Sequence, residues 1–368
     1  MLDLFWPPES DLYFVDGGRY TAFARLFLRR AASCETVVGG IGLLHPPELF
    51  EIRNRNLAEV LAALRRSAPC SLAQLVEETE IGLTTVKKCI EQCVASGMVL
   101  HGEIAASTGG RKAQQYLLNP KYQYYLMLLT DNNTFVCRLY DFNCCCVAQT
   151  RRSFSMEHFF EQLCGAIRFY LSEYEVGTLC LSLPCVVKDG KIVDWYYNPA
   201  LQGFPMQEEL ERCFGVHVLV QNDMKLTVLG AASNMRETAK LNLVTAQFGH
   251  NGIGVGEMVN GQVLEGFSGF AGEVGYTHGV RKDIMGTAYL ARIVRSVIIC
   301  INPQKIIFYR SDRQNRFDKI FEEAVRGLPA YAVPEYAVSE AYFQDMTDGF
   351  FRLIDRKGYY KKGSDPNA

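Results

Sequence analysis

The sequence predicts an α/β protein in which a small winged helix-turn-helix precedes a larger mixed domain. In residues 51–120, apolar residues recur at helical spacing in three segments, and two strands follow. Further along, short apolar strands alternate with helices, and residues 248–276 contain nine glycines. A chain of 368 residues is long enough for two or three domains with substantial cores.

The composition is that of an ordinary globular protein, with 48% hydrophobic and 21% charged residues. The net charge of −2 offers no overall basic field for a nucleic acid. The 13 cysteines include no Cys-x-x-Cys pair, the N-terminus lacks the basic start of a signal peptide, and no apolar run is long enough to cross a membrane. We therefore expect a cytoplasmic protein with reduced thiols and no membrane partner, and we assign no function to residues 1–50.

Three helices are predicted ahead of the two strands. The first has an apolar stripe within residues 52–64. The second begins at a capping box formed by Ser71 and Gln74. The third turns the apolar residues of the segment 86–94 inward, and Gly97 ends it. Three helices followed by a hairpin are the elements of a winged helix-turn-helix, whose third helix enters the major groove of DNA.

The polar face of the third helix and the turn between the two strands supply the candidate DNA-binding residues. These are Thr84, Thr85, Lys87, Lys88, Arg111 and Lys112. Residues 51–120 hold eight Lys and Arg against seven Asp and Glu, a net charge of +1, so charge does not decide the matter. The alternative is a small helical domain that contacts another protein.

The nine glycines of residues 248–276 let the backbone turn tightly and approach a ligand. The Asn-Gly pair at 260–261 also fits a simple β-hairpin. The ordered string Gly-Ile-Gly-Val-Gly (252–256), Asn-Gly and Ala-Gly-Glu-Val-Gly (271–275) resembles the core signature of the ROK family of repressors, open reading frames and sugar kinases. The resemblance implies an actin-like, sugar-kinase (ribonuclease H-like) fold for residues 121–360.

Residues 51–120 also resemble the DNA-binding part of ROK repressors, most clearly in Leu-Ala-Gln-Leu (72–75) and Ser-Thr-Gly-Gly-Arg (107–111). Two positions depart from the family pattern. The usual turn glycine is Glu80 here, and the helix-capping serine is Gly82. Glycine is an acceptable N-cap, but a carboxylate at Glu80 is expected to weaken binding to the phosphate backbone.

The first hairpin of the larger domain departs further from the family. Its sugar kinases carry Asp-x-Gly-Gly-Thr at this turn, where the aspartate and bare glycine backbone manage ATP phosphate and magnesium. Here Thr130 replaces the aspartate, Asn132 and Asn133 replace the glycines, and only Thr134 matches. Asparagine tolerates left-handed geometry, so the turn can form, but its side chains fill the space of a phosphate. We expect a degenerate domain with no catalytic residues, no enzyme activity and no cofactor.

The resemblance implies a ligand site in the same domain. Asn222 and Asp223 follow a buried strand and match a pair that hydrogen-bonds the sugar; in the kinases the aspartate accepts the proton of the attacked hydroxyl. Glu273 matches a sugar-binding glutamate. Asn198 is a further candidate, although a loop asparagine that caps Pro199 explains it equally well.

The zinc site of the family is not expected. Tyr276 stands where the family has a zinc-binding histidine, and Cys300 is the only cysteine after it, so four nitrogen and sulfur ligands cannot be assembled locally. His278 is expected at the surface. An Asn-Pro strand at residues 301–308 follows the glycine-rich stretch much sooner than in the family, so the intervening zinc subdomain and its adjoining helices are expected to be missing.

The sequence therefore predicts a transcriptional regulator of the ROK type, in the sense of a repressor. Its expected partners are a double-stranded DNA operator, a sugar or sugar-phosphate effector, and further copies of the chain in a homodimer or homotetramer. Two alternatives belong to other classes. One is an active sugar kinase, against which the altered phosphate turn argues. The other is a ligand-blind regulator or interaction scaffold with a vestigial pocket.

Overall fold

The computed structural model describes residues 47–103, 113–233, 235, 240–249, 252–278, 286–311 and 316–359. These residues belong to one compact unit that begins at Pro47, where the first helix also begins. The predictions for residues 1–46, for Arg111 and Lys112, and for the side chain of His278 fall outside the described residues.

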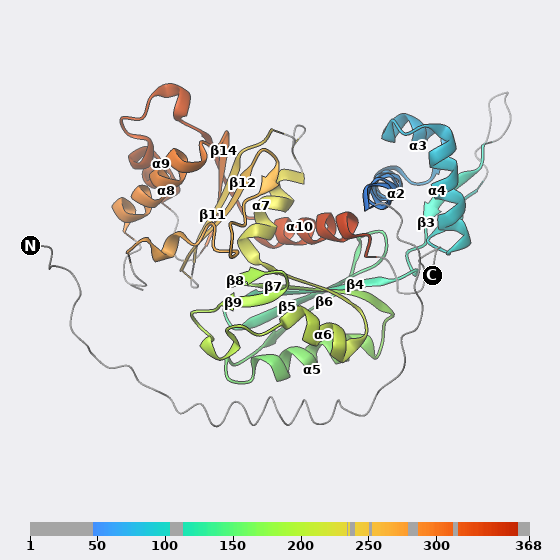
Figure 1. The fold of residues 1–368 in the computed structure, drawn as a ribbon, viewed down its shortest axis with the longest axis horizontal. Helices are drawn as coiled ribbons and strands as arrows, with labels where there is room; N and C mark the ends of the chain where they lie inside the picture. The colour runs from blue at the N-terminus through green and yellow to red at the C-terminus, as the bar shows by residue number, and fades with distance from the viewer. Residues whose placement is uncertain are drawn as a thin grey trace, which may run out of the picture. The chain divides into compact units, whose positions relative to one another are not determined.

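Three helices open the described chain (Figure 1). They are α2 (Pro47–Ser67), α3 (Leu72–Thr79) and α4 (Leu83–Ala95). Leu64, Leu75 and Ile90, one from each helix, are fully or almost fully buried in a shared core. The predicted capping box is confirmed, because the Ser71 hydroxyl accepts from the Gln74 backbone N–H while the Gln74 side chain accepts from the Ser71 N–H.

A small sheet accompanies these helices. Strands β2 (Val99–His101) and β3 (Gln115–Leu118) pair antiparallel, and β1 (Cys70–Ser71) pairs with the other edge of β3. The order of helices and strands agrees with the predicted one. The segment that would form the wing, residues 104–112, lies outside the described residues, so the winged helix-turn-helix stays a prediction.

The rest of the chain forms two lobes. Lobe 1 is a five-stranded sheet in the order β10-β7-β4-β5-β6. Its strands are β4 (Tyr124–Asp131), β5 (Thr134–Tyr140), β6 (Cys146–Ser153), β7 (Val176–Leu183) and β10 (His217–Asn222). Helices α5 (Phe159–Leu171) and α6 (Met206–Phe214) cover one face, and the hairpin of β8 (Val186–Lys188) and β9 (Lys191–Asp194) extends β7 (Figure 1).

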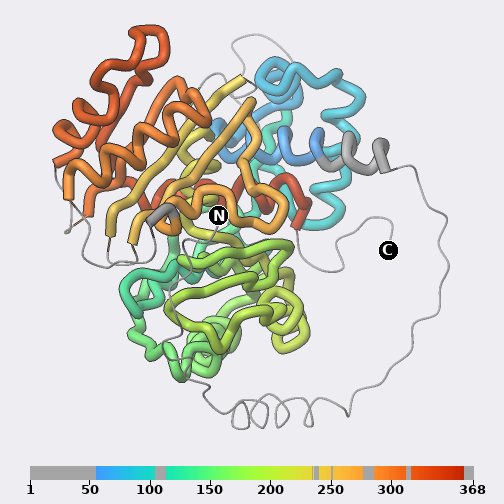
Figure 2. The backbone as a smooth tube through the Cα atoms, turned by 60° about the vertical axis from the view of Figure 1, so that its left-hand side comes forward, coloured from blue at the N-terminus to red at the C-terminus, as the bar shows by residue number. Residues whose placement is uncertain are grey.

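Lobe 2 repeats this plan with the order β13-β12-β11-β14-β15. Its strands are β11 (Leu243–Gly249), β12 (Gly252–Val259), β13 (Gln262–Val263), β14 (Lys305–Tyr309) and β15 (Glu335–Ser339). Helices α8 (Thr287–Ile301) and α9 (Phe317–Val325) cover its outer face. Figure 2 shows the two lobes as separate groups of strands, lobe 1 in green and lobe 2 in yellow and orange.

Each lobe therefore has three antiparallel strands, a helix, a parallel strand, a second helix, another parallel strand and a final helix. The final helices are α7 (Asp223–Ser233) and α10 (Tyr342–Lys357), and they pack against each other. The mixed α/β fold predicted for this part of the chain is confirmed.

Glycine allows the close crossing of α7 and α10. A Cβ atom on Gly230 of α7 would lie 1.8 Å from the carbonyl oxygen of Asp345, and one on Gly349 of α10 would lie 2.3 Å from that of Leu226. Both distances are far below contact, so the two backbones touch where any side chain would separate them.

Two elements of lobe 2 differ from the expectation. The interval after the glycine-rich stretch, expected to lack helices, contains α8, and the predicted strand begins only at Lys305. The β-branched residues of α8 are typical of strands, but residues three or four apart, such as Leu290, Val294 and Val297, share its buried face. Ser339 ends β15, and α10 begins at Tyr342.

Candidate functional site

A polar pocket lies where β10, β11 and β12 meet the start of α7. Its empty space is roughly 450 Å³, part of it open to solvent. The lining residues are Pro184, Asn222, Asp223, Met224, Gln247, Gly249, Gly252, Ile253, Gly254, Val255, Gly272 and Glu273. The carboxyl ends of parallel strands and the start of the following helix are where α/β sheets commonly bind ligands. The structure thus brings three of the four predicted ligand residues to one place.

Asp223 is the first residue of α7 and is almost completely buried. Its Oδ1 accepts from the Met224 backbone N–H at 2.8 Å, and its Oδ2 accepts from the Tyr342 hydroxyl at 2.8 Å. Burial raises the pKa of Asp223 to about 6, although these two hydrogen bonds partly oppose the shift. Burial, followed by the charge of Asp223, also holds the pKa of Tyr342 well above its usual range.

Asn222 positions the turn between β10 and α7. Its side-chain N–H donates to the Cys185 carbonyl at 3.0 Å, and its Oδ1 accepts from the Lys225 backbone N–H at 3.0 Å. Both ends of the amide are therefore used within the protein. Asn222 lines the pocket mainly as a support that fixes the direction of Asp223.

Glu273 faces Asp223 across the pocket from the glycine-rich segment. Burial, and then the charge of Asp223, raise the pKa of Glu273 to about 7, while the nearby Lys225 ammonium opposes the shift. Lys225 is itself buried, which lowers its pKa, and it donates to the Gly269 carbonyl. Asp223 and Glu273 line the same pocket, and their oxygens can accept hydrogen bonds from ligand hydroxyl groups.

Several glycines of the signature stretch are needed for packing. A Cβ on Gly256 would lie 2.0 Å from the Met224 carbonyl oxygen, and one on Gly272, where φ is +88°, would lie 2.3 Å from that of Val255. Gly256 lets β12 approach α7 closely, and Gly272 lets the following loop approach β12 closely. Gly249, Gly252 and Gly254 also line the pocket, where they present bare backbone.

The segment after β13 also holds the two lobes together. Glu265 accepts from the Lys188 ammonium of β8 at 2.8 Å, and the Tyr276 hydroxyl donates to Asp194 of β9 at 2.6 Å. Burial acts to raise the pKa of Glu265, but the hydrogen bond and charge of Lys188 outweigh it and lower that pKa. The bond to Asp194 raises the pKa of Tyr276 to about 12. Tyr276 thus points at the β9 strand and is not among the pocket-lining residues.

The turn between β4 and β5 has the geometry that the sequence predicts for asparagine. Asn132 and Asn133 have φ of 44° and 59°, and Asp131 pairs with Thr134 across this two-residue turn. The Thr130 hydroxyl is buried and donates to the Ser182 carbonyl at 2.9 Å. The Thr130 hydroxyl is therefore turned into the sheet.

Asn198 lies away from the other predicted ligand residues. Its side-chain N–H donates to the Met156 carbonyl at 3.0 Å, and the residue precedes the short helix η1 (Pro199–Leu201). It is buried and does not line the pocket. The structure brings Asn222, Asp223 and Glu273 together and leaves Asn198 apart.

The described candidate DNA-binding residues all lie on the outer face of α4. Thr84, Thr85, Lys87 and Lys88 are exposed, while Val86 between them is buried. Lys87 lies 3.7 Å from the exposed carboxylate of Glu91 one turn later. The structure therefore confirms that the polar face of α4 predicted from the sequence is exposed to solvent.

Neither a metal centre nor a membrane span is found among the described residues. No three histidine, cysteine or acidic side chains of the described ranges are grouped closely enough to hold a metal ion. Among the described helices, none combines the length and the apolar character that crossing a lipid bilayer requires.

Comparison with known proteins finds one family that matches part of the chain. Residues 132–287 match the model of the ROK family. This part of the chain is similar to the ROK family. The N-acetylglucosamine repressor of Escherichia coli O6:H1 is 24% identical over 245 residues, which cover 61% of this chain and 57% of the repressor. The xylose repressor of Bacillus subtilis is 24% identical over 239 residues, covering 61% and 60%. This chain thus spans less than two thirds of each repressor's length.

Solved structures agree with the ROK fold. A ROK family transcriptional regulator, a homologue of the Escherichia coli MLC protein, superposes with a TM-score of 0.62 at 16% identity, over 84% of this chain and 100% of that chain. A ROK family protein from Streptococcus pneumoniae in complex with sucrose gives 0.50 at 16% identity, over 65% and 100%. At these identities the likeness concerns the fold.

The range that matches the ROK family contains Asn222, Asp223 and Glu273 but ends before Tyr342. Tyr342, which binds Asp223 from α10, is the pocket partner that the sequence did not reveal. Lys225, behind the pocket, was also missed. Tyr342 belongs to no recognisable local motif and meets the site only through tertiary packing. Lys225 stands two residues after Asp223, but its contact with Gly269 forms only in the folded chain.

Proposed function

We propose that this chain is a sugar-responsive transcriptional repressor of the ROK type. Residues 51–120 form the winged helix-turn-helix that binds a double-stranded DNA operator, and residues 121–360 sense the sugar and dimerise. The observation that carries the proposal is the convergence of Asp223 and Glu273 on one polar pocket, in a chain whose named relatives are repressors.

The DNA-binding half rests on the exposed face of α4. Lys87 and Lys88 are exposed on it beside two threonines, so cationic and hydroxyl groups are both available to phosphates. The ion pair of Lys87 with Glu91 is largely exposed and weak, so a phosphate can replace it. Arg111 and Lys112 would add contacts from the wing.

The effector half rests on the chemistry of the pocket. The carboxylates of Asp223 and Glu273 accept hydrogen bonds, and the bare backbone around Gly252 and Gly254 allows a ligand to approach closely. A polyhydroxylated ligand, a sugar or a sugar phosphate, matches this set of acceptors. Asp223 is the residue that the ligand is proposed to need most.

We propose no kinase activity. Support comes from the turn at Asn132 and Asn133, where two side chains occupy positions that a phosphate needs bare, and from the buried Thr130 hydroxyl. The named relatives are repressors, which favours regulation over catalysis.

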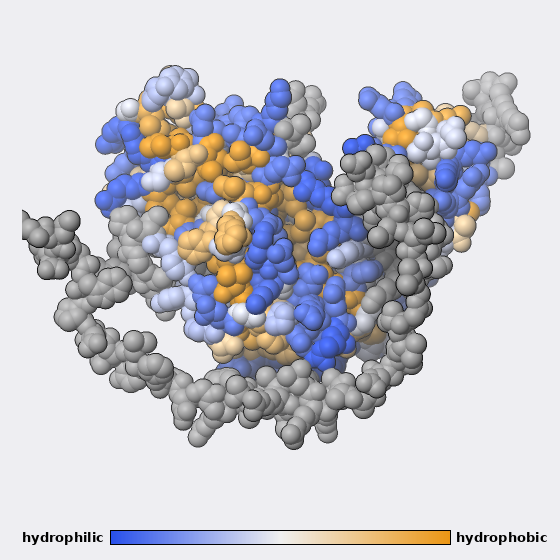
Figure 3. Space-filling view, viewed as in Figure 1, coloured by the Kyte–Doolittle hydropathy of each residue, from blue (hydrophilic) through white to orange (hydrophobic). Residues whose placement is uncertain are grey.

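Self-association is proposed through lobe 2. Figure 3 shows hydrophobic residues gathered over α8 and the neighbouring strands of this lobe. Ile299 on α8 is 63% exposed, and Tyr331 and Tyr336 near β15 are also exposed. Exposed apolar surface of this kind marks interfaces, and copies of one chain most often pair about a twofold axis. A homodimer, or a homotetramer built from two of them, is the expected state.

One observation favours the ligand-blind scaffold as a second candidate. Both oxygens of Asp223 already accept hydrogen bonds within the protein, from Met224 and from Tyr342. A ligand must share or displace one of these donors. If neither donor can be shared or displaced, Asp223 cannot bind a ligand and the regulator responds to no sugar.

Two measurements on the purified full-length chain test the proposal. Selection from randomised duplex DNA should recover a sequence that binds specifically. Calorimetry with a panel of sugars and sugar phosphates, beginning with N-acetylglucosamine and D-xylose, should find a ligand that changes the affinity for this DNA. Asp223→Ala should lose the response to the sugar while still binding this DNA specifically. Specific DNA binding without any sugar response would establish the scaffold instead, and no specific DNA binding would refute the regulator.

A further inference from the structure

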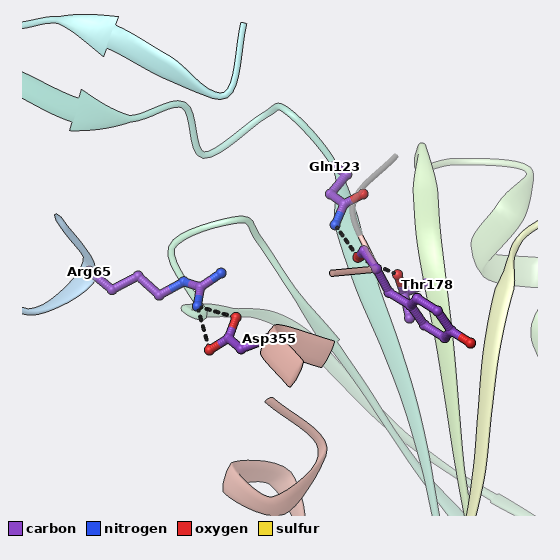
Figure 4. A network of polar contacts seen from close by, with 5 residues as sticks. Arg65, Gln123, Thr178 and Asp355 are labelled. Carbon is purple, nitrogen blue, oxygen red and sulfur yellow. Dashed lines mark hydrogen bonds and ion pairs between the residues drawn. The ribbon is translucent and has the colours of Figure 1, made fainter. Parts of the chain in front are cut away.

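Helix α10 makes a polar contact near each of its ends. At its start, the Tyr342 hydroxyl donates to Oδ2 of Asp223 in the pocket at 2.8 Å. Near its end, both carboxylate oxygens of Asp355 accept from Nη1 of Arg65 on α2, at 2.9 and 3.1 Å (Figure 4). At 1.5 Å per residue, the two contacts lie about 20 Å apart along the helix.

The helix between these contacts is tightly held. It crosses α7 at the backbone-to-backbone contacts of Gly230 and Gly349, and Asp345 accepts from the buried Tyr309 hydroxyl at 2.5 Å. A displacement at one end of so closely packed a helix moves the other end as well, because interiors have no free volume to absorb it. The carbonyl of Tyr359, just after α10, accepts from Gln123 and Thr178 of lobe 1 (Figure 4).

The contact with α2 fixes a side chain that is mostly buried. The Arg65 side chain is 11% exposed and that of Asp355 is 23% exposed. The Arg65 guanidinium also lies over the Phe142 ring at 5.8 Å. The Arg65 guanidinium is expected to follow the Asp355 carboxylate, because separating the two would leave a buried charge uncompensated. Leu61 and Leu64 of α2 share a core with residues of α4, so a movement of Arg65 would act on α2 and α4 together.

We propose that α10 couples the pocket to the DNA-binding helices, with Tyr342, Asp355 and Arg65 as its positioning residues. This inference rests on the proposed function. A ligand hydroxyl that donates to Oδ2 of Asp223 competes with the Tyr342 hydroxyl for the same oxygen. Release of Tyr342 frees the start of α10 to shift, and Asp355 carries the shift to Arg65 and α2. The ligand changes DNA affinity only because it favours one position of α10 over the other.

The test is a double-mutant cycle measured without any sugar. Full-length variants Tyr342→Phe and Asp355→Asn, and the two combined, are compared for their dissociation constant on the selected DNA. For two substitutions this far apart, the fold-changes in the dissociation constant normally multiply to within about twofold. If α10 couples the two sites, the fold-change of the double variant should differ from the product of the two single fold-changes by at least about threefold. This difference exceeds the twofold variation expected of independent sites. Tyr336→Phe is the matched control, because it removes a hydroxyl donated to Asp318 at 2.9 Å away from α10. When Tyr336→Phe is combined with Asp355→Asn, the two fold-changes in the dissociation constant should multiply.

A second readout does not need DNA. Hydrogen exchange of α2 and α4 should rise in Tyr342→Phe and stay unchanged in Tyr336→Phe. The reversed pair Arg65→Asp with Asp355→Arg should restore the exchange pattern that either single reversal disturbs. Multiplicative effects on DNA affinity together with unchanged exchange in α2 would overturn the coupling while leaving the proposed function intact. Raised exchange in a chain that binds no DNA would refute the proposed function while the coupling stands.

Discussion

The Tyr342 hydroxyl donates a hydrogen bond of 2.8 Å to Asp223, a residue 119 positions earlier in the chain. The contact joins the first turn of α10 to the first turn of α7, so each of the two repeated lobes contributes one partner. Asp223 is 7% exposed, and burial raises its pKa to about 6. The carboxylate is thus ionised at neutral pH at a cost to the folded state, which is expected where an acceptor serves a ligand.

The first prediction concerns stability against pH. An unfolded aspartate has a pKa near 3.9, so between about pH 4 and 6 the folded state binds the Asp223 proton more tightly. The contribution of Asp223 to stability therefore falls as pH rises through this window, by up to about 3 kcal/mol. Asp223→Asn removes this fall and should gain stability relative to wild type between pH 4 and 7.

Urea denaturation at several pH values measures the difference between the two proteins. Because burial also raises the pKa of Asp345 to about 6, the wild-type curve alone is not diagnostic. Glu322→Gln on the surface of α9 controls for the loss of one negative charge. Curves for wild type and Asp223→Asn that run parallel from pH 4 to 7 would rule out the raised pKa.

Local patterns predicted much of the fold. The capping box of Ser71 and Gln74 and the left-handed turn at Asn132 and Asn133 follow from short-range hydrogen bonding and backbone sterics, which the sequence carries directly. Helix α8 was missed because the prediction for this interval rested on its short length relative to the family pattern, whereas the apolar residues of α8 pack against lobe 2.

The site was predictable as far as its motifs reached. Asn222, Asp223 and Glu273 were found because the glycine-rich signature and the strand-end pair are contiguous in sequence. Tyr342 could not be found in this way, since nothing near it in sequence indicates that α10 begins beside Asp223. Asn198 sits in a family-like segment, yet its amide is directed at the Met156 carbonyl.

The second prediction concerns DNA binding by α4. Lys87→Glu combined with Lys88→Glu should lower operator affinity by at least roughly 100-fold at physiological salt, because two phosphate contacts become repulsions. Both side chains are exposed, so the thermal unfolding temperature should change little. Fluorescence anisotropy with labelled operator gives the affinity. Lys319→Glu with Arg326→Glu, an equal charge change in lobe 2, should bind as wild type does. Equal losses in both double variants would mean that total charge rather than α4 governs binding.

The third prediction concerns Glu80, which ends α3 in left-handed geometry with φ of 57° and ψ of 14°. A residue with a Cβ is strained there, and its carboxylate lies just before the proposed recognition helix. Glu80→Gly should stabilise the protein by about 1 kcal/mol or less, after the added freedom of the unfolded chain is subtracted. It should also raise DNA affinity several-fold.

Glu80→Gln separates the two causes, because it removes the charge and keeps the strained Cβ. It should match Glu80→Gly in DNA affinity but not in stability. An affinity unchanged in both variants would place Glu80 away from the DNA.

The last prediction concerns the crossing of α7 and α10. A methyl group added by Gly230→Ala would meet the Asp345 carbonyl oxygen at 1.8 Å, and one added by Gly349→Ala would meet that of Leu226 at 2.3 Å. Neither neighbour can move aside, since both are helix backbone, so the helices must separate. Each change should cost roughly 2–3 kcal/mol or more. Gly165→Ala on α5, where nothing lies within 4 Å, should instead gain up to about 1 kcal/mol from helix propensity.

Urea denaturation of the three variants provides the comparison. Since separating the helices displaces both Tyr342 and Asp355, the folded fractions of Gly230→Ala and Gly349→Ala should also bind operator with altered affinity. Gly165→Ala should not, because α5 covers the far face of lobe 1. If Gly349→Ala is as stable as the wild type, then α10 lies farther from α7 than the 2.3 Å distance to the Leu226 carbonyl oxygen implies. A destabilised variant with unaltered operator affinity would instead show that α10 supports the fold without transmitting a signal through it.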